Sequence, residues 1–487
     1  MPSAEGLTAL IVLRLNMLPD KYVLVMFAAM ALLLIFSAVL LFAGKAGTGK
    51  KVRRIIACIF VLLMVCGCAV VAKVASDAYR TMHAVTTKPA VTTNARNVYV
   101  LVREDDPAQS LKDAAEYTFG LIEDYDIEHT DQAIIEIGEA IGKEPDVQAF
   151  ATGAEVADAL LGSELDAAVL NGVSIALLQD QEGYEDFVQK IRILSTMSME
   201  FLEEAVETTA PTETLPPEEN ITNTPFIVYI SGSDTRSKLL TVSRSDVNIL
   251  MVVNPVSKQV LLLNTPRDYY VPNPAGNGRL DKLTHCGIYG VECSVEALEG
   301  LYDLEIDYYG QVNFTGLETL VDAVGGITVY SDQAFSARGV YIYVGENNLN
   351  GAQALDFCRE RYHVAGGDNG RGKNQMKVIK AVIEKMTTGT TVISKYSSIL
   401  KSLEGMFQTS ISTEEISMLV KMQLDDMASW NVNTFAVTGS GGSEKTYSMP
   451  GAYAYVMYPN ESVVDYASQL VDRVLAGEIL TEEDMNP

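Results

Sequence analysis

The sequence has few basic residues for its length, and this shortage limits the partners that the protein can bind. Of 487 residues, 36 are Lys or Arg and 63 are Asp or Glu, which gives a formal net charge of −27. A protein that neutralises nucleic-acid phosphates needs a basic surface. The composition therefore argues against nucleic acid as a partner. An anionic substrate must be held by a local cluster of Arg or Lys.

Histidine and cysteine are also scarce. The chain has four His and six Cys, and it contains neither a Cys-x-x-Cys pair nor a Cys/His spacing that suits zinc. Imidazole chemistry is therefore a poor first expectation. Cys286 and Cys293 could form a disulfide, but on one continuous helix they would lie about 10 Å apart by rise alone, too far to bridge. We expect free thiols.

Long hydrophobic runs are confined to the first 75 residues. Tyr22 to Ala43 is a run of 22 residues without a charge, and Ile55 to Ala72 is a run of 18. Runs of about 20 apolar residues are long enough to cross a bilayer as helices. Leu7 to Leu18 is shorter and contains Arg14, which suits an interfacial helix better. Residues 1–80 are therefore predicted to form a membrane anchor with spans at 22–43 and 55–72.

The loop between the two runs indicates which way the anchor faces. Its sequence, GKAGTGKKVRR, holds five basic residues, and short loops rich in Lys and Arg stay cytoplasmic. Two spans joined inside the cell place everything after Lys73 outside it. We therefore expect a cell-membrane protein with an extracellular catalytic part.

Two folded parts are predicted beyond the anchor. Residues 97–205 alternate strand and helix signals, with a strand at 97–101, a helix at 108–123, a helix at 156–161 and a strand within 164–172. This pattern predicts a smaller α/β accessory domain. Residues 206–225 are acidic and rich in Thr and Pro, which is typical of a semi-rigid linker. The second folded part runs from 226 to 487.

This second part reads as an α/β domain. Strands are expected at 226–231, 246–254, 259–264, 327–330 and 433–437. Those at 246–254 and 259–264 are apolar at consecutive positions, as in strands covered on both faces. Helices are expected at 295–301, 314–324, 351–361, 375–387 and 462–476. The pattern predicts a three-layer α-β-α domain with a mixed sheet.

Charged clusters follow or precede three of these strands. Ser231 to Arg236 follows the first, Arg244 to Asp246 precedes the second, and Thr265 to Asp268 follows the third. Loops at strand ends form the ligand crevice of an open α/β sheet. Carboxylates such as Asp234 and Asp246 suit Mg²⁺ or Mn²⁺, and arginine forks match phosphate oxygens. The pattern indicates phosphoryl transfer.

Several stretches resemble the LytR-CpsA-Psr family. They are GSDTRS, SRSDVNILMVVNP, LLLNTPRDYYVP, KLTHCGIYG, IDYYGQVNF, LVDAVGGITV and LNGAQALDFCRERY with DNGRGKNQ. The chain length, the two-helix anchor and the accessory domain are similar to capsule-type members. The resemblance implies a membrane-anchored phosphotransferase that moves a glycopolymer from a polyprenyl-pyrophosphate carrier onto peptidoglycan.

The resemblance also implies roles for individual residues. Asp234 and Asp246 would hold a divalent ion, Mg²⁺ or Mn²⁺, on the pyrophosphate, and an apolar pocket would take the polyprenyl chain. The residues expected around the phosphates are Arg244, Arg267, Lys282, Arg359, Arg361, Arg371 and Gln375. The residues expected to act in catalysis are Asp234, Arg244, Arg267, Arg359, Arg361 and Asp368.

Two points stay open from the sequence. The family usually has Arg-Gln-Gln where this chain has Asn374-Gln375-Met376, so one cation is missing. Lys373 is adjacent, but a neighbour on a helix points about 100° away. Transfer, hydrolysis of the carrier lipid, and binding of the lipid pyrophosphate without turnover would all use the same cluster. Capsule, teichoic acid and secondary wall polysaccharide all remain candidates for the polymer.

Overall fold

The computed structural model describes most of the chain from residue 97 onward and parts of the N-terminal region. The described residues are 20–42, 51–63, 65–66, 73, 86, 97–123, 127–178, 181, 183–184, 186–197, 220–233, 244–388, 395, 399, 406–449 and 453–485. Asp234, residues 206–219 of the expected linker and residues 67–72 of the second apolar run lie outside them.

The N-terminal region contains an apolar helix. Helix α2 (Asp20–Phe42) coincides with most of the first apolar run, and residues 51–63 are also helical. The Phe36 and Phe60 rings meet edge to face, with centroids 5.6 Å apart. Of the helices in the described part of the chain, none meets the length and hydropathy needed to cross a membrane. The spans expected at 22–43 and 55–72 therefore have no support from the structure.

The first sheet has five strands in the order β3-β2-β4-β1-β5. It comprises β1 (Val98–Arg103), β2 (Thr118–Ile122), β3 (Asp146–Phe150), β4 (Ala167–Asn171) and β5 (Ile191–Met197). Strand β2 is parallel to β3 and β4, whereas β1 is antiparallel to β4 and β5. Helix α4 (Ile127–Ile141) covers one face and α5 (Gly153–Leu161) covers the other. Helix α6 (Gly172–Leu178) follows β4 directly.

The helix expected at 108–123 is wrong. This segment forms a short 3-10 helix, Leu111–Ala114, and then strand β2. Phe119 and Gly120 lie in the sheet interior, and a Cβ at Gly120 would stand 2.3 Å from Leu165 Cδ2. The close packing of β2 on Leu165 therefore needs glycine at this point. Tertiary contacts decide this segment, and local helix propensity does not.

The second sheet has six strands in the order β16-β11-β6-β7-β8-β17. It comprises β6 (Phe226–Ser233), β7 (Val247–Asn254), β8 (Gln259–Asn264), β11 (Tyr308–Asn313), β16 (Phe407–Thr409) and β17 (Asn431–Ala436). Strands β11 and β6 are parallel, as are β8 and β17, and the remaining neighbours are antiparallel. The sheet is therefore mixed, as expected for the α/β class.

Helices cover both faces of this sheet. Helices α8 (Val291–Tyr302) and α14 (Glu461–Leu475) pack on the face that carries Leu250, Leu261 and Leu263. Helices α11 (Asp368–Thr387) and α13 (Thr413–Asp426) pack on the face that carries Ile249 and Leu262. Successive residues of β7 and β8 thus enter different cores, which explains their unbroken apolar sequence.

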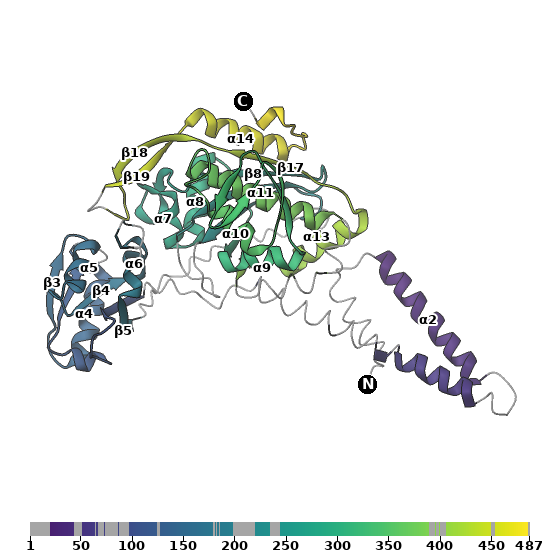
Figure 1. Ribbon diagram of the computed structural model, residues 1–487, viewed down its shortest axis with the longest axis horizontal. Helices are drawn as coiled ribbons and strands as arrows, with labels where there is room; N and C mark the ends of the chain where they lie inside the picture. The colour runs from purple at the N-terminus through teal and green to yellow at the C-terminus, as the bar shows by residue number, and fades with distance from the viewer. Residues whose placement is uncertain are drawn as a thin grey trace.

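The remaining elements extend this domain. Helices α9 (Phe314–Val324) and α10 (Gly351–Arg359) join α11 around a further core with strands β12 (Ile327–Ser331), β13 (Phe335–Ala337), β14 (Val340–Ile342) and β15 (Gly345–Leu349). Two antiparallel pairs, β9 (Tyr270–Asn273) with β10 (Arg279–Lys282) and β18 (Gly439–Lys445) with β19 (Tyr453–Pro459), lie outside the six-stranded sheet. Figure 1 shows β18 and β19 at the edge of the domain nearest the five-stranded sheet, and α2 at the opposite end of the molecule.

Candidate functional site

The site is organised around Arg267, which follows β8. Its Nη1 atom lies 2.6 Å from Oδ1 of Asp246, the residue before β7. Strands β7 and β8 are antiparallel, and Ile249 stands opposite Asn264, so the start of β7 and the end of β8 meet at one edge. Both side chains are largely buried, at 14% and 8% exposed. The structure thus joins two of the predicted site residues.

Asp268 and Lys282 extend the cluster. The Lys282 Nζ atom lies 2.6 Å from Asp268 Oδ1, and Arg267 Nε lies 3.8 Å from Asp268 Oδ2. Strand β10 brings Lys282 here, because its last residue pairs with Tyr270 of β9, two residues after Asp268. Lys282 therefore belongs to the cluster through a buried carboxylate.

Helix α11 supplies the third side of the cluster. Asp368 opens the helix, and its Oδ1 atom lies 2.5 Å from Arg371 Nη2 and 3.9 Å from Arg267 Nε. The approach of α11 to β8 depends on Gly372, because a Cβ there would stand 2.5 Å from Asn264 Nδ2. The glycine lets the helix start lie against the end of the strand that leads to Arg267.

The charges in this cluster act on one another strongly. Burial alone would lower the pKa of Arg267, but the carboxylates of Asp246, Asp268 and Asp368 outweigh burial and raise it. The pKa of Arg371 is lowered by burial and by the charges of Arg267 and Arg361, against the opposing effect of Asp368. The surroundings of Arg371 therefore disfavour its positive charge. An anion that binds beside Arg371 would stabilise that charge.

The other predicted residues lie at different distances from this cluster. Arg361 is close enough for its charge to act on Arg371, and its guanidinium stacks 4.7 Å from the Tyr362 ring. Arg359, the last residue of α10, stacks 4.5 Å from the Phe314 ring. Gln375 is buried on α11, whereas Lys373 on the same helix is exposed. Lys373 therefore does not replace the cation that the family usually has at position 374.

The predicted metal pair is not assembled within the described residues. Asp234 lies outside them, and Asp246 is bonded to Arg267. Among the residues that the structure describes, no group of three or more His, Cys, Asp or Glu side chains is arranged to hold a metal ion. The predicted metal pair of Asp234 and Asp246 therefore stays a prediction.

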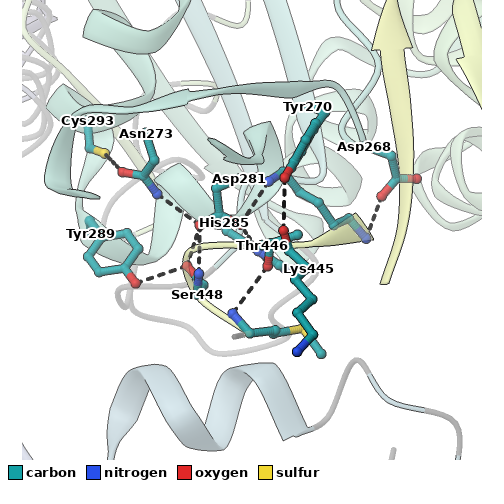
Figure 2. Close-up of polar contacts among 12 residues, drawn as sticks. Asp268, Tyr270, Asn273, Asp281, His285, Tyr289, Cys293, Lys445, Thr446 and Ser448 are labelled. Atoms are coloured by element: carbon teal, nitrogen blue, oxygen red, sulfur yellow. Dashed lines mark hydrogen bonds and ion pairs between the residues drawn. The ribbon is translucent and has the colours of Figure 1, made fainter. Parts of the chain in front are cut away.

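A second polar cluster centres on Asp281, the residue before Lys282 (Figure 2). The Asp281 carboxylate accepts hydrogen bonds from Asn273 Nδ2 at 3.0 Å, from the Lys282 backbone N–H at 2.8 Å and from the Ser448 hydroxyl. It also contacts His285 Nδ1 at 2.6 Å. Burial alone would raise the pKa of Asp281, but His285 and these donors lower it. This cluster fixes the backbone that carries Lys282.

The two cysteines near this cluster do not share a continuous helix. Helix α7 (Leu283–Cys286) and a 3-10 turn end at Gly290, whose φ is +117°, and α8 begins at Val291. Both thiols are free and buried in the same core. The expected free thiols are present, although helix rise does not set the distance between them. The Cys293 thiol instead donates to Asn273 Oδ1 at 3.4 Å.

A protein-family model matches more than half of the chain. The LytR_cpsA_psr family model matches residues 195–469. The chain belongs to the LytR-CpsA-Psr family. The match takes in the six-stranded sheet and every member of the Arg267 cluster.

Individual relatives match part of the chain. A polyisoprenyl-teichoic acid–peptidoglycan teichoic acid transferase TagU from Enterococcus faecalis is 36% identical over 197 residues, which is 40% of this chain and 64% of the relative. The TagU of Oceanobacillus iheyensis is 34% identical over 44% of this chain and 67% of its own length. This chain thus spans about two thirds of the length of these relatives. The crystal structure of B. subtilis TagV is 25% identical, with a TM-score of 0.44 over 53% of this chain and 99% of that one.

Sequence reasoning missed two features of this LytR-CpsA-Psr site. Asp268 is the carboxylate that joins Arg267 to Lys282, and it stood in the charged cluster after β8 without being assigned a role. Asp281 and His285 are the second feature, and the low histidine content gave no reason to single them out. Their spacing of four residues was the available signal, and both are fully buried in the structure.

Proposed function

We propose that this protein transfers a glycopolymer from a polyprenyl-pyrophosphate carrier to peptidoglycan. The observation that carries the proposal is the buried cluster of Arg267, Lys282 and Arg371 at the strand ends of a LytR-CpsA-Psr domain. The Nε atom of Arg267 is buried and has no hydrogen-bond partner among the residues that the structure describes. A buried guanidinium with a spare donor is suited to a phosphate oxygen. The names of the TagU relatives describe the same kind of transfer.

The cluster supports transfer by charge neutralisation. An acceptor hydroxyl of peptidoglycan forms a bond to the phosphorus next to the glycopolymer, and the bond from that phosphorus to the bridging oxygen breaks. The products are a phosphodiester and the polyprenyl monophosphate, and the hydroxyl proton leaves to solvent or to a carboxylate. Arg267 and Arg371 stabilise negative charge on the phosphoryl oxygens, and Lys282 and Asp268 hold Arg267 in place. Arg244, Arg359 and Arg361 are proposed to bind the second phosphate.

A divalent ion remains part of this proposal. Mg²⁺ or Mn²⁺, when bound, would offset charge on the pyrophosphate. Asp234 and Asp246 are the proposed ligands, and Asp246 would have to exchange Arg267 for the ion. An apolar pocket for the polyprenyl chain also remains part of the proposal. It would lie between the sheet and a helical layer, with its mouth beside Arg267 and Arg359.

The proposal places the protein in the cell membrane with this domain outside. It rests on the two uncharged runs and the basic loop between them. On α2, Leu24, Leu32 and Phe42 are 70%, 67% and 84% exposed, and such side chains favour an apolar environment. Protease added to intact spheroplasts should remove the domain after residue 97. Protection of this domain until the membrane is permeabilised would contradict the assignment.

Activity is tested with the full chain in detergent. The chain is incubated with lipid-linked glycan, peptidoglycan oligomers and Mg²⁺, and the products are analysed by mass. We expect the glycan mass plus one phosphate on the peptidoglycan oligomer, and we expect Arg267→Ala to abolish it. Arg338→Ala, at an exposed turn between β13 and β14, is the matched control and should leave the product yield unchanged.

The alternatives give different products in the same experiment. A hydrolase would release free phosphorylated glycan without any adduct on the oligomer. A binding protein would retain the lipid pyrophosphate and return it unaltered. Either result would overturn the transferase proposal while leaving the role of the cation cluster in place.

A further inference from the structure

The β18–β19 hairpin presents two tyrosines on one face. Tyr453 and Tyr455 are two residues apart on β19, so their side chains point the same way. Their cross-strand partners are Lys445 and Ser443. Tyr453 is 70% exposed and Tyr455 is 54% exposed. We call this the tyrosine face of the hairpin.

A glycine lets the Tyr455 ring lie across the ribbon. A Cβ at Gly441 would stand 2.9 Å from Tyr455 Cε2 and 3.0 Å from its phenolic oxygen. The ring therefore covers the bare backbone of β18, and its other surface stays open to solvent. Lys445 lies 5.7 Å from the centroid of the Tyr453 ring. The face consists of aromatic rings with small neutral neighbours and a single cation.

The inner end of the tyrosine face reaches the Arg267 cluster. Met457, two residues beyond Tyr455, is buried, and its N–H donates to the backbone oxygen of Asp268 at 2.7 Å. Burial raises the pKa of Tyr455, and the charges of Asp268 and Asp368 raise it further. Exposure thus increases from Met457 to Tyr455 to Tyr453. The tyrosine face therefore extends from the phosphate-binding cluster to the solvent-exposed surface.

The chemistry of this face suits sugar rings. Tyrosine offers a large, rigid, amphipathic contact surface at low conformational-entropy cost. The apolar C–H face of a pyranose can stack on each ring while its hydroxyls bond to water, to serine or to the phenols. Alternate residues of a strand lie about 6–7 Å apart, which lets neighbouring sugars of a chain meet neighbouring rings. A polyanion is disfavoured because the chain carries a net charge of −27.

We propose that the tyrosine face binds the acceptor glycan strand and directs it toward the Arg267 cluster. This inference rests on the proposed function for the identity of the glycan as acceptor. Tyr453 and Tyr455 bind consecutive sugars, and Gly441 keeps the Tyr455 ring in its stacking position. The substrate class is a neutral polysaccharide backbone.

The test measures binding of peptide-free peptidoglycan glycan strands to the full chain in detergent by calorimetry. The double variant Tyr453→Ala/Tyr455→Ala should bind about tenfold more weakly, because it loses both ring surfaces. The Tyr→Phe versions should bind within about twofold of wild type, because they keep the rings. Gly441→Val should weaken binding with both tyrosines intact. Tyr343→Ala, an exposed tyrosine at 64% outside the hairpin, is the matched control and should change nothing.

The same variants are titrated with a soluble polyprenyl pyrophosphate analogue. Unchanged analogue binding with weakened glycan binding supports the inference. Absence of glycan binding in wild type overturns it, as does equal binding by wild type and the double Ala variant, or equal loss in Tyr343→Ala. If wild type fails to bind the analogue while the tyrosine variants still lose glycan binding, the proposed function fails and the glycan site stands.

Discussion

Arg267 is contacted by three carboxylates at once, and this distinguishes it from an arginine in a simple ion pair. Nη1 lies 2.6 Å from Asp246, and Nε lies 3.8 Å from Asp268 and 3.9 Å from Asp368. A planar fork can serve several partners in fixed directions, whereas an ammonium is a compact point charge. The shape of the group therefore matters here as much as its charge.

Replacing Arg267 with Lys should impair binding although the charge is kept. We expect the Kd for a soluble polyprenyl pyrophosphate analogue to rise at least about tenfold, because a hydrogen bond to a charged group is worth about 1.5–3 kcal/mol. Titration calorimetry on the full chain measures this, with exposed Arg338→Lys as the matched control. Wild-type affinity in Arg267→Lys would mean that Arg267 serves only its carboxylates.

Asp281 makes stability depend on pH. Its folded-state pKa lies below the ordinary value of 3.8 because His285 and the hydrogen-bond donors outweigh burial. The depressed pKa contributes stability that is fully present above about pH 4, and this stability is lost as pH falls through the folded-state pKa. Asp281→Ala should cost about 1–3 kcal/mol at pH 7, because it leaves buried hydrogen-bond donors without their acceptor.

The single tryptophan allows this to be measured in the right domain. Trp430 precedes β17, and its Nε1 donates to Gln423 at 2.7 Å. Its fluorescence during denaturant unfolding reports the six-stranded domain. The loss of stability between pH 6 and pH 3 should be smaller in Asp281→Ala than in wild type. The same acid dependence in both proteins would exclude Asp281 as its source.

At the scale of elements, the start of α11 shows what sequence reasoning could not locate. The helix was expected at 375–387 and begins at Asp368. The stretch GGDNGRG contains four glycines, each about 1 kcal/mol worse than Ala in a helix. Packing compensates: Gly370 lies against Ala365 and Gly372 against Asn264. Only the early start places Asp368 and Arg371 three residues apart on one helical face.

The packing of these glycines can be tested by comparing an Ala substitution at one of them with an Ala substitution at a glycine that has open space around it. A Cβ at Gly370 would stand 2.4 Å from the carbonyl oxygen of Ala365, so Gly370→Ala must displace backbone. We expect it to destabilise the domain by about 1–3 kcal/mol and to weaken analogue binding by moving Asp368 and Arg371. Gly300→Ala in α8 meets nothing within 4 Å and should stabilise the domain by about 0.5–1 kcal/mol. Trp430 fluorescence distinguishes the two, and similar effects from both would refute the packing argument.

The strands that the sequence predicts are present in the structure, for a physical reason, but β2, β3, β5, β11 and β16 of the two main sheets were not predicted. The strand at 259–264 and the helix at 314–324 match β8 and α9 residue for residue, because continuous apolar runs and terminal glycines are strong local signals. The sequence could locate those charged site residues that lie directly beside a predicted strand. The pairing of Asp268 with Lys282, and the approach of Tyr455, depend on the β9–β10 and β18–β19 pairs. Those pairings are long-range, and no local pattern encodes them.

At the scale of the whole molecule, a small apolar contact joins the two sheet-containing parts. Val173 and Leu177 of α6 pack against Ile288, with Tyr289 and Met449 beside them. The Tyr289 hydroxyl lies 2.9 Å from the Ser448 hydroxyl, which in turn bonds to Asp281. The contact is thus two hydrogen bonds away from the residue that precedes Lys282.

A charge placed in this contact should separate the parts without unfolding either. Leu177 is 5% exposed, so Leu177→Asp buries an unpaired carboxylate unless the contact opens. Because interfaces this small permit relative domain motion, we expect opening, seen as a larger radius of gyration by small-angle scattering of the full chain in detergent. The free energy of unfolding reported by Trp430 should stay within about 0.5 kcal/mol of the wild-type value, since that tryptophan lies in the other part. Val188→Asp, at a 41% exposed position of the first part, is the matched control and should leave the scattering unchanged.

If the contact also supports Lys282 through Tyr289 and Ser448, Leu177→Asp should weaken analogue binding by about twofold to fivefold. Unaltered scattering together with unaltered binding would show that this contact does not hold the two parts together.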